Sequence, residues 1–131
     1  MAILVPVDGS ECSMRALEFA IDLAEARDET IDVVHFTDYE GDASSELEER
    51  VGEVLADAGI DGGMEVVGDI RLSDFKASNR VGKDILELVA DREYDHVVMG
   101  HHGTGYVESG LLGSAAETVV ESTSVPVTVI P

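Results

Sequence analysis

Short apolar runs that alternate with amphipathic stretches constrain the fold of this chain more than any other feature. "AILVPV" (2–7) is an unbroken apolar run, which is typical of a strand buried on both faces of a parallel sheet. Further strands are predicted at 31–37, near 64–72, at 95–100 and at 125–130, and helices at 11–27, 44–58, 83–94 and 114–122. Because parallel neighbours need crossover helices, this order predicts an α/β fold, a doubly wound five-stranded parallel sheet with helices on both faces.

The length and the first residues of the chain limit its organisation. A chain of 131 residues corresponds to one domain, so we expect residues 1–131 to form a single unit. No apolar run approaches the roughly 18 residues that span a bilayer. The start of the chain lacks a basic segment and reaches Asp8 early, unlike a signal peptide. We therefore expect a cytoplasmic protein without a membrane partner.

The charge balance excludes one class of partner. There are 28 acidic and 8 basic residues, so the net charge is 8 − 28 = −20. Such a charge repels itself in dilute buffer but is screened in about molar salt, where the Debye length is about 3 Å. This favours a halophilic source over an ordinary acidic cytosolic protein. The few Lys and Arg residues cannot build a basic stripe, so no nucleic-acid partner is expected.

Two loops of the predicted sheet carry residues suited to a ligand. In doubly wound sheets ligands bind at the carboxyl ends of strands, where Asp8 follows the first strand and Gly100 ends the fourth. The helix that starts at Gly113-Ser114 offers free N–H groups and a positive end to an anion. Ser114 alone could be a simple helix-start residue, so both phosphate binding and plain capping stay open. Ser10 is the expected N-cap of the first helix.

The spacing Gly100-x2-Gly103-x9-Gly113-Ser114 resembles the nucleotide-binding signature of the universal stress protein (UspA-like) family, in its ATP-binding branch. "ILVPVDGSECSMRALEFAIDLA" also resembles the opening strand, turn and helix of that family. The resemblance covers nearly the whole chain and is poorest at 63–82. It implies strand order 3-2-1-4-5, a homodimer, and ATP bound across the first and fourth strands. Mg²⁺ would be carried mainly by the phosphates.

The resemblance also implies which residues bind the nucleotide. Val5, Pro6 and Val7 would border the adenine, with His35 and Phe36 lining the base less certainly. Asp8 would hold the ribose or act near the metal. The fourth strand and its loop would contribute Met99, Gly100, His102 and Gly103, and the last helix would contribute Gly113, Ser114 and Ala115 through backbone N–H groups.

Several site assignments have competing interpretations. Many family members carry a basic residue after the second glycine, where this chain has Thr104, and His101 or His102 could compensate. A metal site on the two histidines is disfavoured because adjacent side chains diverge and no third ligand is evident. The single cysteine, Cys12, is expected to be a packed residue. Asp8 could simply accept turn hydrogen bonds. Lys83 could reach a phosphate, but a solvated first-turn position is expected.

The functional prediction rests on the last strand and on the lack of an evident group of catalytic residues. An uncharged edge strand at 125–130 would expose backbone groups unless something covers it. The resemblance implies that it pairs with its symmetry mate, and the alternative is an edge protected by Pro126 and Pro131. The leading function is a nucleotide-responsive stress or regulatory module with at most slow hydrolysis. The alternatives are a weak ATPase, for which no general base or cationic clamp is evident, and an interaction dimer with a vestigial pocket. No catalytic residue is predicted, and ATP, ADP and AMP stay undistinguished.

Overall fold

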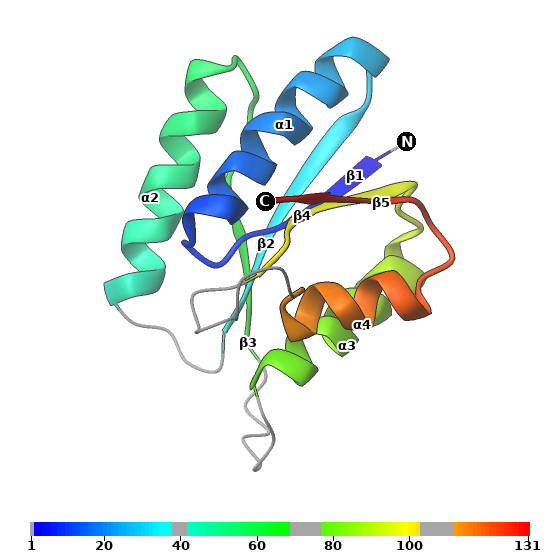
Figure 1. The fold of residues 1–131 in the computed structure, drawn as a ribbon. Coiled ribbons are helices and arrows are strands. Elements are labelled where there is room, and N and C mark those ends of the chain that lie inside the picture. The colour runs from blue at the N-terminus through cyan, green and yellow to red at the C-terminus, as the bar shows by residue number, and fades with distance from the viewer. Residues whose placement is uncertain (1, 38–41, 69–76, 103–111) are drawn as a thin grey trace.

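The computed structural model describes residues 2–37, 42–68, 77–102 and 112–131. Its five strands form one parallel sheet in the order β3-β2-β1-β4-β5 (Figure 1). Their bounds are Ala2–Pro6 for β1, Thr30–Thr37 for β2, Glu65–Gly68 for β3, His96–Gly100 for β4 and Val127–Ile130 for β5. The predicted fold class and strand order are confirmed.

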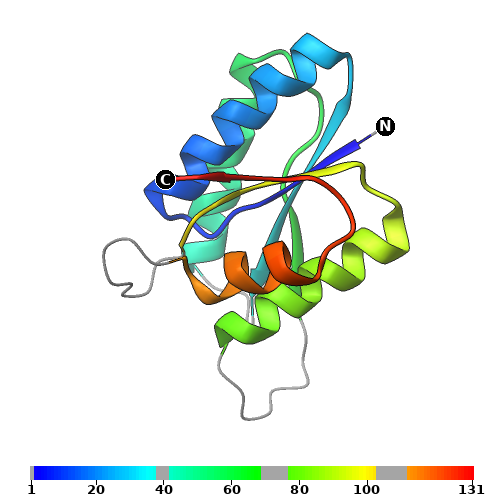
Figure 2. The same cartoon turned by 45° about the vertical axis from the view of Figure 1, so that its right-hand side comes forward.

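Four helices cover the two faces of this sheet (Figures 1 and 2). On one face lie α1 (Glu11–Arg27) and α2 (Asp42–Asp57), and on the other lie α3 (Ala77–Arg92) and α4 (Ser114–Ser122). None of the helices that the structure describes is both long and apolar enough to cross a bilayer.

The central strand β1 explains why its sequence is continuously apolar. Ile3 and Val5 belong to the buried cluster beneath α1 and α2, whereas Leu4 belongs to the cluster beneath α3 and α4. All three side chains are fully buried. A strand with a helical layer on each face has no solvent-facing side, so the sequence does not alternate with polar residues.

The start of α3 differs from the prediction. The helix begins at Ala77 rather than at Lys83, and Lys83 is an exposed residue beyond the first turn. Gly82 directly precedes the predicted start but lies inside the observed helix, where α3 meets α4: a Cβ there would be 2.7 Å from Cβ of Thr118 and 3.2 Å from the carbonyl oxygen of Ala115. Close helix packing therefore outweighs the low helix propensity of glycine.

The other boundaries agree more closely. Helix α2 runs over Asp42–Asp57 against the predicted 44–58, and β3 is observed at Glu65–Gly68. The predicted continuation of this strand to residue 72 lies outside the described residues.

Candidate functional site

The candidate site lies at the carboxyl ends of β1 and β4. These strands are neighbours, and the chain winds from β1 through β2 to β3 on one side and from β4 to β5 on the other. Ligands of open α/β sheets bind at such a reversal of winding. The turn after β1, the end of β2, the chain leaving β4 and the start of α4 all reach this part of the molecule (Figure 1).

The turn after β1 is organised by Asp8. Its Oδ1 accepts hydrogen bonds from the backbone N of Ser10 at 2.9 Å and from the hydroxyl of Ser10 at 2.5 Å. Ser10 in turn caps α1 as predicted, because its Oγ accepts from the backbone N of Ser13 at 3.2 Å. Asp8 thus accepts hydrogen bonds within the turn, as expected if its role is structural. Its second carboxylate oxygen has no hydrogen-bond partner among the residues that the structure describes.

The packing of α1 on β4 explains why position 100 is a glycine. A Cβ at this position would lie 2.7 Å from Sγ of Cys12 and 3.0 Å from the backbone N of Ser13. Real Cβ atoms do not come closer than 3.0 Å to such neighbours, so only glycine lets the first turn of α1 rest on the end of β4. The glycine is therefore required for packing, whatever it offers to a ligand.

Gly113 also packs against protein. It donates its N–H to the carbonyl oxygen of His101 at 2.6 Å, and a Cβ on it would lie 2.8 Å from Cα of His102. This contact holds the start of α4 beside the chain that leaves β4. The predicted site segments Gly100–His102 and Gly113–Ala115 are therefore neighbours in space.

The two helix starts at this edge differ in their capping. Helix α1 is capped by a serine side chain, whereas the N-cap of α4 is Gly113, which makes no side-chain hydrogen bond. Ser114 and Ala115, the first residues of α4, are half-buried. The N–H groups at a helix start need partners, and an anion can supply them.

The predicted base-lining residues face opposite sides of the sheet. His35 Nδ1 lies 2.8 Å from the carbonyl oxygen of Val7, and because a carbonyl only accepts, Nδ1 carries the proton. This bond brings the imidazole to the carboxyl end of β1. Phe36 instead packs with Met99 in the cluster beneath α3 and α4. Pro6 and Val7 are buried at the end of β1.

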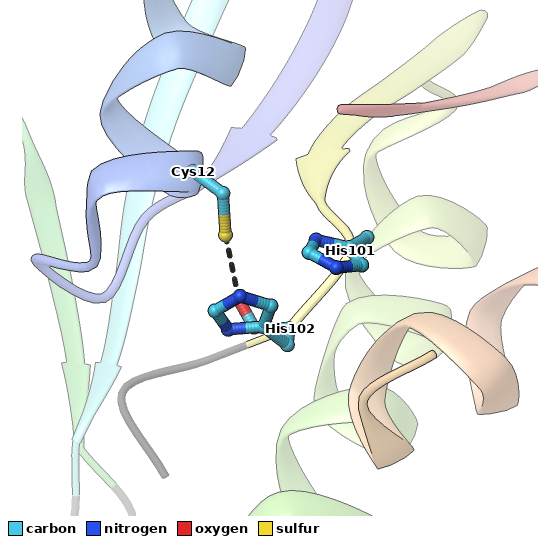
Figure 3. A group of neighbouring side chains, drawn as sticks. All are labelled: Cys12, His101 and His102. Atoms are coloured by element: carbon cyan, nitrogen blue, oxygen red, sulfur yellow. Dashed lines mark hydrogen bonds between the residues drawn. The ribbon is translucent and has the colours of Figure 1, made fainter. Parts of the chain in front are cut away.

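A third candidate metal ligand, which was not evident from the sequence, lies beside the two histidines. Cys12, on the first turn of α1, has its Sγ within 4.8 Å of a ring nitrogen of His101 and of His102, and these two nitrogens also lie within 4.8 Å of each other. Figure 3 shows the thiol pointing from α1 toward the histidines. The sequence signal was the position of Cys12 just after the β1 turn, since β4 lies next to β1.

Two positions in the glycine-rich loop cannot be placed in this arrangement. Gly103, a predicted binding residue, and Thr104, which replaces the usual basic residue, lie outside the described residues.

Fold and topology together define the class: a doubly wound α/β protein whose sheet reverses its winding between β1 and β4, where ligands of open α/β sheets bind. A sequence model of the universal stress protein family matches residues 1–131, and the chain therefore belongs to this family.

Individual relatives agree with this assignment. The chain is 28% identical over 139 aligned positions to universal stress protein MJ0531 of Methanocaldococcus jannaschii, covering 98% of this chain and 80% of that protein. Its fold is similar to that of universal stress protein UspA from Lactobacillus plantarum, with a TM-score of 0.75, 20% identity and coverage of 100% and 97%. It is also similar to a universal stress protein from Archaeoglobus fulgidus solved in complex with dAMP, with a TM-score of 0.72, 21% identity and coverage of 100% and 98%.

Proposed function

We propose that this chain binds an adenine nucleotide, ATP being the expected form, at the carboxyl ends of β1 and β4, and that it acts as a nucleotide-responsive stress or regulatory module. The observation that carries the proposal is the start of α4, where a glycine N-cap leaves the helix without a side-chain cap at the predicted phosphate position. Family membership and the dAMP complex of the Archaeoglobus fulgidus protein support an adenine nucleotide as the ligand.

The donors at this edge suit the parts of a nucleotide. Backbone N–H groups of Ser114 and Ala115 and the hydroxyl of Ser114 match phosphate oxygens, whereas the N–H of Gly113, also predicted to contact phosphate, is donated to the carbonyl oxygen of His101. The carboxylate oxygen of Asp8 that is not used in the turn matches a ribose hydroxyl. His35 offers a polar imidazole at the end of β1, where Pro6 and Val7 are buried beside it.

Mg²⁺ would offset the negative charge that a triphosphate brings to this acidic protein. A triphosphate brings several negative charges to a protein of net charge −20, and Thr104 supplies no positive charge. Mg²⁺ prefers oxygen ligands and binds largely through substrate phosphates, which would carry the ion here. We therefore expect ATP binding to depend on Mg²⁺ much more strongly than AMP binding does.

Calorimetric titration in concentrated KCl tests the nucleotide site directly. Ser114→Asp places a carboxylate in the first turn of α4, where it stabilises a helix but repels phosphate. Ser114→Asn is the matched control, because it has the same size without the charge. We expect saturable ATP·Mg²⁺ binding to the wild type, a modest loss in the Asn variant and a loss of at least about tenfold, or about 1.4 kcal/mol, in the Asp variant.

Two results would contradict the nucleotide proposal. One is the absence of binding to folded wild-type protein, and the other is equal affinity in the Asp and Asn variants. The first would favour an interaction dimer with a vestigial pocket. A weak ATPase is favoured only if metal-dependent ADP release accompanies binding.

The edge strand β5 supports the proposal of a homodimer through residues 125–130. Arg15 donates from Nε to the carbonyl oxygen of Pro131 at 2.9 Å, which places this side of α1 at the end of β5. Phe19 lies one turn further on the same stripe of α1 and is 43% exposed. Pairing of two β5 edges would cover the backbone groups of β5 and bring the apolar surface of a second copy near Phe19.

A proline substitution separates this dimer from the fold. The carbonyl oxygens of Pro126 and Ile130 accept hydrogen bonds from the N–H groups of Val97 in β4 and of His101 just after it. By strand alternation the N–H of Val129 therefore points to the outer edge. Val129→Pro should yield monomers in sedimentation experiments, whereas Val129→Ala should remain dimeric. A wild type that is monomeric in concentrated KCl would remove the proposal.

The proposal also covers the type of source organism and the cellular location of the protein. The charge of −20 favours a salt-adapted source, and we propose the cytoplasm as the site of action.

A further inference from the structure

We propose that Cys12, His101 and His102 bind one borderline-soft divalent cation, of which Zn²⁺ is the type, at a site separate from any Mg²⁺ carried by nucleotide phosphates. One thiolate and two imidazoles form a ligand set that suits Zn²⁺ and Co²⁺ and that Mg²⁺ disfavours. The proposal does not depend on nucleotide binding.

The geometry is close to that of a metal site. The three ligand atoms all lie within 4.8 Å of one another, and the imidazole centroids are 4.2 Å apart with an angle of 65° between the rings. Bond lengths of about 2.3 Å to sulfur and about 2.0–2.1 Å to nitrogen put tetrahedral ligands roughly 3.3–3.6 Å apart. Side-chain rotations that shorten the separations by about an ångström would therefore close the site around an ion.

One atom of the cluster needs a partner. Nδ1 of His101 is buried and has no hydrogen-bond partner among the described residues. A buried polar atom in this state is costly, and such atoms call for an explanation such as an ion or a water. A cation bound at the histidines supplies that explanation, either by coordinating this nitrogen or by turning the ring so that it reaches solvent.

The cysteine changes partners when the ion binds. In the described structure its thiol donates a hydrogen bond to the carbonyl oxygen of His102 at 3.0 Å (Figure 3). Coordination forms a bond from sulfur to the metal and releases the thiol proton to solvent, so this hydrogen bond is lost. The Cys12 side chain already points at the histidines, and only a short movement is required.

Three protein ligands leave one position of a tetrahedral ion open. A site with an open position exchanges its metal more readily than a closed structural site. The cluster therefore suits reversible binding of a metal ion better than a permanent structural role. It draws on the first turn of α1 and on the end of β4, two elements held in contact by Gly100.

Metal titration without nucleotide tests this inference. Reduced protein, freed of metal by a chelator, is titrated with Zn²⁺ against a chromophoric competitor in KCl with excess Mg²⁺, which occupies surface carboxylates. Co²⁺ serves as the spectroscopic probe, because thiolate ligation gives a charge-transfer band and tetrahedral geometry gives intense visible bands. We expect one equivalent of Zn²⁺ and both Co²⁺ signatures.

Variants identify the ligands. Cys12→Ser should abolish the charge-transfer band, and His101→Ala and His102→Ala should each weaken Zn²⁺ binding by about tenfold or more. His96→Gln is the matched control, since His96 lies at the other end of β4 and its Nε2 is 2.8 Å from Oγ1 of Thr128. This variant should bind like the wild type.

The proposal is overturned if Zn²⁺ binding is displaced by Mg²⁺, if the Co²⁺ complex of the wild type lacks the thiolate band, or if the His96 variant loses as much affinity as the other histidine variants. The cobalt spectrum requires no substitution, so it decides the matter even if Cys12→Ser fails to fold. Failure of ATP binding would leave all of these results unchanged, and the two proposals are therefore tested separately.

Discussion

Replacing Gly100 by alanine tests the close packing of α1 on β4. The added methyl group would lie 2.7 Å from Sγ of Cys12, 3.1 Å from its carbonyl carbon and 3.0 Å from the backbone N of Ser13. Cys12 is only 1% exposed, and two of these neighbours are backbone atoms, so the first turn of α1 has to shift. Overpacking of this kind costs about 1–3 kcal/mol, which is the expected loss in the free energy of unfolding.

Urea denaturation in concentrated KCl, followed by circular dichroism, measures this loss. With a slope of about 1–3 kcal/mol per molar urea, the midpoint should fall by roughly 1 M. Gly52→Ala is the matched control, because a Cβ at this position in α2 would meet nothing within 4 Å. Alanine is the better helix former by up to about 1 kcal/mol, so the same substitution should raise the midpoint there.

A double-mutant comparison shows which neighbouring atoms clash with the methyl group at position 100. Cys12→Ala removes the nearest contact of the new methyl group but leaves the two backbone contacts. Gly100→Ala should therefore cost less in the Cys12→Ala background than in the wild type, yet still destabilise. An unchanged or raised midpoint for Gly100→Ala in the wild-type chain would refute the packing explanation for this glycine.

Three further outcomes are expected. Ser10→Ala should lower the free energy of unfolding by about 1 kcal/mol in the same urea assay, because α1 loses the cap that accepts from Ser13. Burial is the largest cause that raises the pKa of Tyr94 from 10.0 to about 12, and a hydrogen bond to Asp32 is the next. Between these values the unfolded chain releases the phenolic proton and the folded chain keeps it, so stability should fall as pH rises from 10 to 12, with a smaller slope in Tyr94→Phe. The thermal midpoint should rise between about 0.1 M and 1 M KCl, as the Debye length falls from about 10 to 3 Å; a midpoint that falls or stays constant would contradict the charge argument.

The sequence predicted the fold class and most helix positions well where the signal is local, whereas the strand order came from the resemblance to the family. The buried run 2–7 and the capped helix at 11–27 carry their own periodicity and boundary residues. The start of α3 was predicted at Lys83 rather than Ala77, next to the segment where the resemblance is poorest; within the helix, a tertiary contact of Gly82 with α4 overrides the low helix propensity of glycine. Local patterns carry no information about such contacts.

The candidate site was predictable only as a set of neighbouring loops. The sequence placed Asp8 and Gly100 at adjacent strand ends, but it could not distinguish a glycine that approaches a ligand from one that approaches protein. The position of Cys12 just after the β1 turn put it near the end of β4, but its contact with His102, 90 positions away, depends on how α1 lies on β4. Both facts come from packing between distant segments, not from spacing along the chain.

The packing requirement at Gly100 and the metal cluster have one physical origin. The approach that leaves no room for a Cβ at Gly100 is also what carries Sγ of Cys12 to the carbonyl oxygen of His102. Any side chain at position 100 pushes the first turn of α1 away from β4, and the thiol moves away from the imidazoles. Stability and Zn²⁺ affinity should therefore fall together in Gly100→Ala. Gly52→Ala, which changes stability in α2 alone, should leave the affinity as it is.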